Sequence, residues 1–366
     1  MMQRLKPWVT PIGLVVVLVA AIAFPFIDTD SATTGIAVVA LIFAAFAVSW
    51  NMFAGYTGYI ALGHSAYFGI GSYALAIICE HNKSLNGWQP LELVPVCGLI
   101  AGVAAIPLGA IALRTRRHTF IVITIATFFI LQLLAENLRG ITNGTTGIYL
   151  PLPSQWFGSQ LGLPNGDFFN IPFYYSALAL TIVALLVSWF VRNSKYGLGL
   201  LAIRDDEDRA RGLGVKTGIF KLSAFVLSAI FVGMAGAIYV YYENFAIPRY
   251  AFDPLNDIAV ALMTFMGGIG TLSGPLLGAL VIESAKLYFG GNFSGWNGGL
   301  YLIVLGALFL VVILLLPQGV VPSLRALWTK WRAAGHIGPV ALPETFKTTS
   351  SVASPPLSVP HKEAKR

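Results

Sequence analysis

Charged residues are scarce in this sequence. They make up 11% of its 366 residues, whereas roughly 25% is usual in soluble globular domains. Hydrophobic residues account for 56%, and apolar stretches long enough to cross a bilayer recur along the chain. This composition excludes a soluble globular protein and predicts a polytopic membrane protein.

Cysteines and catalytic motifs are also lacking. The two cysteines, Cys79 and Cys97, match neither a CxxC nor a metal-binding spacing, so we interpret them as small buried residues. The sequence has no Walker A motif, no HExxH motif and no GxSxG element. We therefore expect no catalytic residue, no metal site and no cofactor bound by this chain.

Apolar segments predict an all-α fold with about ten transmembrane helices. Most are close to the roughly 20 residues that a helix needs to span a bilayer. The segments are 10–27, 34–53, 58–79, 91–113, 119–136, 173–191, 219–242, 256–267, 272–289 and 298–317. We expect residues 256–289 to form a hairpin of one short and one longer helix, because the intervening GGIGTLSGP should break a helix.

Positive charges mark one side of the membrane. Most of the 23 Lys and Arg residues fall before the first segment, at 114–118, at 192–221 and after the last segment. With ten spans, the positive-inside rule places all four regions and both termini in the cytoplasm. The net charge of +7 then reflects membrane orientation, and we expect no nucleic-acid partner.

The two ends of the chain differ from the segments between them. The N-terminus has a basic start, an apolar run and Ala-Ile-Ala at 21–23, so a cleaved signal peptide is an alternative to a retained first helix. Either leaves the remaining topology unchanged. We expect a membrane domain over residues 1–332 and a disordered cytoplasmic tail over 333–366, which is rich in Pro, Ser and Thr.

The cytoplasmic segment 192–221 is too long for a simple turn between two spans. It contains LLAIRDDEDRARGLGV, in which acids come first and arginines follow, an order that complements a helix dipole. Gly214 is suited to stop such a helix. The pattern predicts a short helix across the cytoplasmic face. The alternative is a solvated connector whose charges only set the topology.

Two glycine-rich stretches interrupt the apolar segments, one in each half of the chain. They contain Gly55, Gly58, Gly63, His64, Gly69 and Gly71, and then Gly267, Gly268, Gly270 and Gly274. Interrupted helices in corresponding halves point to a transport pathway, where a half-helix N-terminus can attract a carboxylate. The alternative is close helix packing, since Gly98-x-x-x-Gly102 and Gly274-x-x-x-Gly278 are small-xxx-small motifs.

Ionisable groups inside the predicted spans are few, the main ones being His64 and the pair Glu283 and Lys286. We interpret His64 as a neutral residue bonded to a backbone carbonyl or hydroxyl, or as a pathway residue. Glu283 and Lys286 can pair at i,i+3 or act near the outer mouth. A secondary transporter or proton pump would need a larger ionisable relay. We therefore expect the energy for uphill transport to come from another chain.

Five segments, in this order, resemble the permease subunits of branched-chain amino acid ABC importers, in particular the LivM-like branch. The resemblance covers residues 35–325 approximately. The segments are AGYTGYIALGHSAYFGIGSYA, RTRRHTFIVITIATFFILQLL with TNGTTGI after it, GLGLLAIRDDEDRARGLGVKTGIFKLSAFVLSAIFVGMAGAIY, GGIGTLSGPLLGAL and LLLPQGVVPSL.

The resemblance implies that the 192–221 loop is an EAA-like coupling element that docks onto a cytoplasmic ATPase. Glu207, Ala210 and Gly214 match the acid, alanine and glycine of that motif, and Arg209 stands where a small residue is more usual. Arg204 and Asp205 belong to the same expected coupling loop.

The resemblance also implies partners in the bacterial inner membrane. They are a second homologous permease subunit, two cytoplasmic ATPase subunits that bind ATP and Mg²⁺, an external solute-binding protein and the lipid bilayer. This chain would be a transport subunit and not an enzyme, with branched-chain amino acids as cargo. Urea, short amides and aromatic acids are alternatives within the family. A stand-alone secondary transporter or channel is an alternative from another class.

Overall fold

The computed structural model describes residues 19–27, 30–83, 85, 89–150, 170–292, 306 and 319–323. The first predicted span is described only over 19–27, and that part is helical. The span predicted at 298–317 and the tail 333–366 lie outside the described residues, apart from residue 306. The number of ten spans and the disordered tail therefore stay predictions.

Helices occupy the other predicted spans, and the polytopic all-α fold is confirmed. The helices are α2 (Ser31–Thr57), α3 (Ser65–His81), α5 (Val94–Ala112), α6 (Arg117–Asn137), α9 (Asn170–Asn193), α12 (Thr217–Glu243), α14 (Pro254–Gly267) and α15 (Gly274–Asn292). In α2, α5, α6, α9 and α12, length and hydropathy both suit a membrane span. The break between α14 and α15 lies where GGIGTLSGP predicts it.

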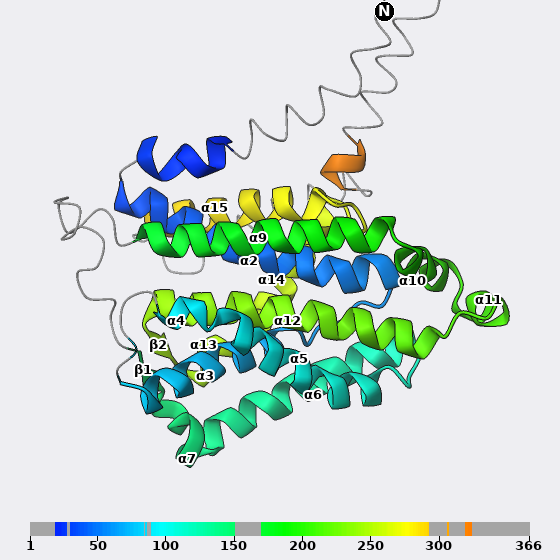
Figure 1. The fold of residues 1–366 in the computed structure, drawn as a ribbon, viewed down its shortest axis with the longest axis horizontal. Helices are drawn as coiled ribbons and strands as arrows, with labels where there is room; N and C mark the ends of the chain where they lie inside the picture. The colour runs from blue at the N-terminus through cyan, green and yellow to red at the C-terminus, as the bar shows by residue number, and fades with distance from the viewer. Residues whose placement is uncertain are drawn as a thin grey trace, which may run out of the picture. The chain divides into compact units, whose positions relative to one another are not determined.

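Short elements connect these helices. They are α4 (Gln89–Glu92), α7 (Arg139–Thr142), η1 (Gly144–Thr146), β1 (Ile148–Tyr149), α10 (Lys195–Asp205), α11 (Glu207–Gly212), β2 (Phe245–Ala246) and α13 (Pro248–Ala251). Strands β1 and β2 pair antiparallel, with Ile148 opposite Ala246. Figure 1 shows this pair at one end of α12 and the α10–α11 segment at the other.

The core is built around α2, which packs against α9, α12, α14 and α15 (Figure 1). From Ala40 to Thr57 every residue of α2 is buried, so this part of the helix is enclosed by protein on all sides. The outer helices differ: Val103 of α5, Val122 of α6 and Phe190 of α9 are each about two-thirds exposed or more. Such apolar outer faces suit contact with lipid or with another membrane subunit.

The third span begins later than predicted. The apolar sequence after Gly58 suggests a helix from residue 58, but α3 begins at Ser65. Gly58 ends α2 in the left-handed region, with φ of 72°. The non-helical backbone that follows is hydrogen-bonded inside the protein: the Trp50 indole donates to the Ala61 carbonyl at 2.8 Å. Non-helical backbone is tolerated at membrane depth when it is buried in this way.

Glycines bring the central helices together, as the packing alternative predicts. Gly98 and Gly102 of α5 face Ile230 of α12. Gly71 of α3 lies directly against the Gly233 carbonyl oxygen of α12. Both cysteines are buried as predicted, Cys79 in α3 and Cys97 in α5.

The α3–α12 contact should not tolerate a methyl group. In Gly71→Ala the new Cβ would overlap the Gly233 backbone, which cannot move aside as a flexible side chain could. We expect the variant to lose about 1–3 kcal/mol of stability, as overpacked cores do. Gly140→Ala is the matched control, because nothing lies within 4 Å of a Cβ there. Thermal unfolding in detergent measures both, and equal melting temperatures would contradict the tight contact.

Candidate functional site

The predicted coupling segment forms two short helices instead of one. Asp206 has extended backbone and separates α10 from α11. Its carboxylate caps α11, accepting from the backbone N–H groups of Asp208 and Arg209, each at 3.0 Å. Two helices form instead of one because Asp206 ends α10 with its extended backbone and starts α11 with its side chain. Gly214 follows α11 with φ of 89°, consistent with its predicted role as a stop.

The other predicted residues of this segment have different surroundings. Ala210 is buried at 2% exposure, whereas Asp205 and Arg209 face outward. Leu213, the residue after α11, is 85% exposed. Figure 1 shows α11 beyond the end of α12. A short helix thus presents an exposed leucine away from the bundle.

Glu207 attaches α11 to the bundle. Its carboxylate lies 2.7 Å from the Lys221 Nζ of α12 and accepts a hydrogen bond from the Tyr59 hydroxyl. Lys221 is only 4% exposed in its side chain, and its Nζ also lies 4.5 Å from the centre of the Tyr59 ring. Arg211 approaches the same carboxylate from the exposed side, at 3.5 Å.

Opposing effects set the charge of Glu207. Burial raises the pKa of this carboxyl, but the hydrogen bonds from Lys221 and Tyr59 and the charges of Lys221 and Arg211 outweigh it. The pKa of Glu207 therefore lies below its ordinary value, so the group is ionised at neutral pH. The ion pair contributes stability above the ordinary pKa of about 4.3 and loses that contribution as the pH falls through the lowered pKa.

Arg204 links the coupling segment to both glycine-rich stretches. Its Nη1 donates to the Gly55 carbonyl at 2.7 Å. A Cβ on Gly58 would lie 3.1 Å from the Arg204 Cγ, and a Cβ on Gly270 would overlap the guanidinium. Because glycine has no side chain, Gly58 and Gly270 leave room for the arginine. The coupling segment and the two glycine-rich stretches therefore meet at Arg204.

Asn51 connects α2 directly to the helix break after α14. Its Oδ1 accepts from the Gly270 N–H at 2.7 Å, and its Nδ2 donates to the Thr271 carbonyl at 2.9 Å. The backbone after α14, which no longer forms helical hydrogen bonds, is thereby satisfied by a side chain of α2. The stretches that the sequence places far apart lie side by side at this point.

A carboxylate occupies the start of α3. Asp257 of α14 accepts from the backbone N–H of His64 at 3.1 Å and from that of Ser65 at 3.1 and 3.2 Å. Asp257 is buried at 2% exposure. The first N–H groups of a helix carry partial positive charge and need acceptors. The N-terminus that could attract a substrate carboxylate is thus filled by a side chain of the protein itself.

The surroundings of His64 differ from the predicted hydrogen bond to a backbone carbonyl or hydroxyl. In the described part of the protein, neither ring nitrogen has a hydrogen-bond partner. The imidazole is instead enclosed by aromatic rings, with ring centres of Phe53, Phe225 and Tyr67 at 5.9, 5.2 and 6.1 Å. The predicted bond to a carbonyl or hydroxyl is therefore corrected to aromatic packing, because these large residues fill the space around the ring.

Most remaining glycines at the predicted site pack closely. Gly63 lies against the Thr124 carbonyl, Gly69 against the Phe252 ring and Gly267 against the Gly274 backbone. Gly268 and Gly270 have positive φ values of 116° and 76°, which end α14 and turn the chain. Close packing and chain turns are therefore sufficient to explain why glycine stands at these positions. A role in the transport pathway stays a prediction.

Sequence reasoning missed Asn51, Tyr59, Lys221 and Asp257. Two of them carried a signal: Lys221 lies where the cytoplasmic segment 192–221 overlaps the span predicted at 219–242, and Asp257 lies in the short segment 256–267. A charged residue in an apolar segment marks a place where the fold must supply a partner. The pairing of Glu283 with Lys286 was predicted and is present, with 2.9 Å between Oε1 and Nζ.

The described side chains offer no group of three His, Cys, Asp or Glu residues that could hold a metal ion. The site instead consists of helix breaks that buried polar side chains stabilise, and of a charged segment that projects at one end of α12. Comparison with known proteins identifies the family. A family model described as the branched-chain amino acid transport system permease component matches residues 32–313. This chain belongs to that family.

Individual relatives agree with the family. The high-affinity branched-chain amino acid transport system permease protein LivM of Escherichia coli (strain K12) is 28% identical over 330 residues, which is 85% of this chain and 75% of LivM. LivH of the same strain is 23% identical, over 76% of this chain and 90% of LivH. The resemblance inferred from the five segments is confirmed, and the chain is a multi-pass membrane permease.

One of the similar proteins is a permease named for a different cargo. The autoinducer 2 import system permease protein LsrC of Salmonella paratyphi B (strain ATCC BAA-1250 / SPB7) is 30% identical over 150 residues, covering 38% of this chain and 43% of LsrC. No solved structure matches the chain.

Proposed function

We propose that this chain is the membrane-spanning permease subunit of an ATP-binding-cassette importer for branched-chain amino acids. It pairs with a second homologous permease subunit and two cytoplasmic ATPase subunits, and an external binding protein delivers the cargo. ATP and Mg²⁺ bind to the partners. The complex sits in the bacterial inner membrane with both termini of this chain in the cytoplasm.

The projection of α11 carries the proposal. A short helix beyond the end of the bundle, with Leu213 85% exposed and arginines on its surface, suits insertion into a cleft of another protein (Figure 1). Beside it lies a polar cleft of about 500 Å³, lined by Arg114, Arg116, His118, Asp205, Asp208 and Lys221 among others. Mixed charges of this kind favour a specific protein partner over a uniformly charged surface.

The contacts of the coupling segment give it a way to act on the membrane domain. Glu207 ties α11 to the start of α12, and Arg204 ties α10 to the end of α2, through Gly55 and Gly58, and to the helix break at Gly270. A displacement of α11 by the ATPase would be transmitted through these contacts to the two breaks. Packed elements that switch between discrete arrangements can then alternate access to a central path.

Uptake by the reconstituted complex tests the function. The chain is purified with its co-purifying partners, placed in proteoliposomes with the binding protein, and assayed for leucine uptake with and without ATP. ATP-dependent leucine uptake is expected. Uptake of urea, a short amide, an aromatic acid or autoinducer 2 in place of leucine would overturn the cargo. Flux through this chain alone, without ATP, would establish a stand-alone transporter or channel instead.

Leu213 provides a test of docking alone. Because its side chain is almost fully exposed, Leu213→Gln should leave folding unchanged, yet it should reduce the recovery of ATPase subunits with the permease by about tenfold, as loss of an interface anchor does. Leu255→Gln is the matched control, because Leu255 is 66% exposed at the start of α14 and follows α13 at the end of α12 opposite to α11. Equal ATPase recovery from both variants would contradict docking at α11.

A further inference from the structure

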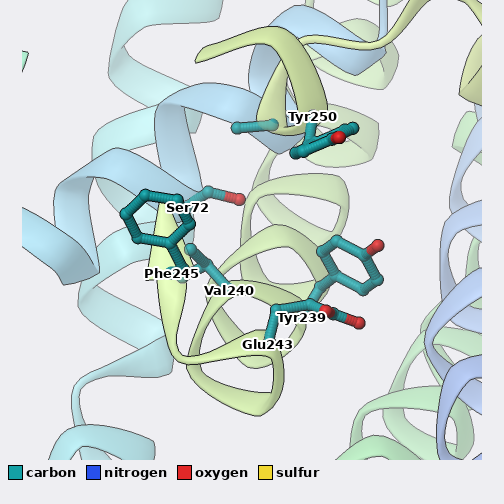
Figure 2. A pocket seen from close by; sticks show the side chains of 7 residues that line it. Ser72, Tyr239, Val240, Glu243, Phe245 and Tyr250 are labelled. Atoms are coloured by element: carbon teal, nitrogen blue, oxygen red, sulfur yellow. The ribbon is translucent and has the colours of Figure 1, made fainter. Parts of the chain in front are cut away.

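A second cavity lies at the end of α12 remote from Lys221. Its volume is about 300 Å³, at the small end of the range for ligand sites. Figure 2 shows its lining, which comes from α3, α12, β2 and α13: Ser72, Tyr239, Val240, Glu243, Phe245 and Tyr250. A cavity of this size can enclose a small molecule but not a folded segment of another protein.

Glu243 lines this cavity, and it is the only charged residue among the lining residues that the structure describes. Glu243 is the last residue of α12 and is exposed. Within the described part of the chain it makes no ion pair or side-chain hydrogen bond. The carbonyl end of a helix also carries partial negative charge, so both features favour a cation.

The remaining walls suit an amino acid. The Tyr239 side chain lies next to Glu243, and Tyr250 lies across the opening from both (Figure 2). Tyrosine rings attract a cation, and their hydroxyls can donate to a carboxylate. Val240 and Phe245 supply apolar surface on the other walls.

We propose that this cavity receives the amino-acid cargo and that Glu243 binds its α-ammonium group. The inference rests on the proposed function and adds the place where the cargo binds and the residue that recognises it. Urea and short amides carry no cation, so a carboxylate at this position favours amino acids among the alternatives. Under the proposed orientation the cavity opens toward the outside, where a binding protein releases its cargo.

Transport kinetics give the first test. In the reconstituted complex, Glu243→Gln should raise the KM for leucine about tenfold, the usual effect of losing one charge-assisted hydrogen bond. Glu92→Gln, an exposed glutamate on α4 at the same end of α12, is the matched control and should keep the original KM. Binding-protein affinity is measured in parallel. A weaker affinity that accounts for the whole change would overturn the proposal, because Glu243 would then act in docking that protein and not in binding the cargo.

Protection of an engineered thiol gives a second test that needs neither transport nor the binding protein. Tyr250→Cys places a thiol at the exposed rim, while Cys79 and Cys97 are buried. Leucine and isopentylamine should slow alkylation of this thiol by a bulky maleimide, and 4-methylpentanoate should not. Adding Glu243→Gln should abolish the protection.

The two tests separate the inference from the proposed function. Equal protection by 4-methylpentanoate, or protection that survives Glu243→Gln, would overturn the ammonium site even if the complex imports leucine. Ammonium-dependent protection in a complex that imports no branched-chain amino acid would keep the site and overturn that cargo.

Discussion

Lys221→Met is expected to destabilise the permease by about 2–4 kcal/mol, in line with the loss of one partner from a buried ion pair. The substitution keeps the length and volume of the buried side chain but leaves the Glu207 carboxylate with only Tyr59 and the exposed Arg211. Because Glu207 holds α11 to the bundle, we also expect coupling to fail: ATP hydrolysis by the partners should continue while leucine uptake falls at least tenfold.

A double variant separates the role of the pair from the role of each residue. Glu207→Gln with Lys221→Met removes both charges, so no unpaired carboxylate remains and most of the stability should return. Melting temperatures of the two single variants and the double variant complete the cycle. If the single and double variants lose the same stability, the ion pair does not hold α11 and the proposed route of coupling is wrong.

The helices were predictable because membrane spans depend mainly on the length of apolar sequence. Segments of that length gave the approximate positions of α2, α5, α6, α9 and α12. The start of α3 was missed because hydropathy does not report backbone conformation: residues 59–62 are apolar, yet they form buried or partly buried non-helical chain. The break at Asp206 was missed for a similar reason, since the same acidic run can begin one helix or end another.

The candidate site was predictable only in outline. Local glycine content located both helix breaks, and charge order located the coupling segment. The contacts that join them, from Arg204 to Gly55 and from Asn51 to Gly270, connect residues about 150 and 220 positions apart. Their pairing depends on how α2, α10 and α14 pack, which no local pattern in one sequence contains. The same limit applies to His64, whose aromatic surroundings come from three separate segments.

Asp257 shows how the two halves of the chain depend on one another. It belongs to the second glycine-rich half, but the N–H groups that it accepts from begin α3 in the first half. Removing the carboxylate would leave two buried backbone donors without an acceptor at the positive end of a helix. The helix break before α3 can therefore persist only while α14 is in place.

Asp257→Ala is accordingly expected to cost about 2–5 kcal/mol, the sum for two buried donors left unsatisfied. Asp257→Asn keeps an oxygen acceptor and should lose less than half as much, measured by thermal unfolding of the purified complex. His64→Phe is the companion control, since it preserves the backbone N–H and replaces an imidazole that has aromatic neighbours with an apolar ring. Stability equal to the unaltered protein in Asp257→Ala would show that the carboxylate does not hold α3, whereas a stable His64→Phe complex that transports no leucine would return His64 to the pathway.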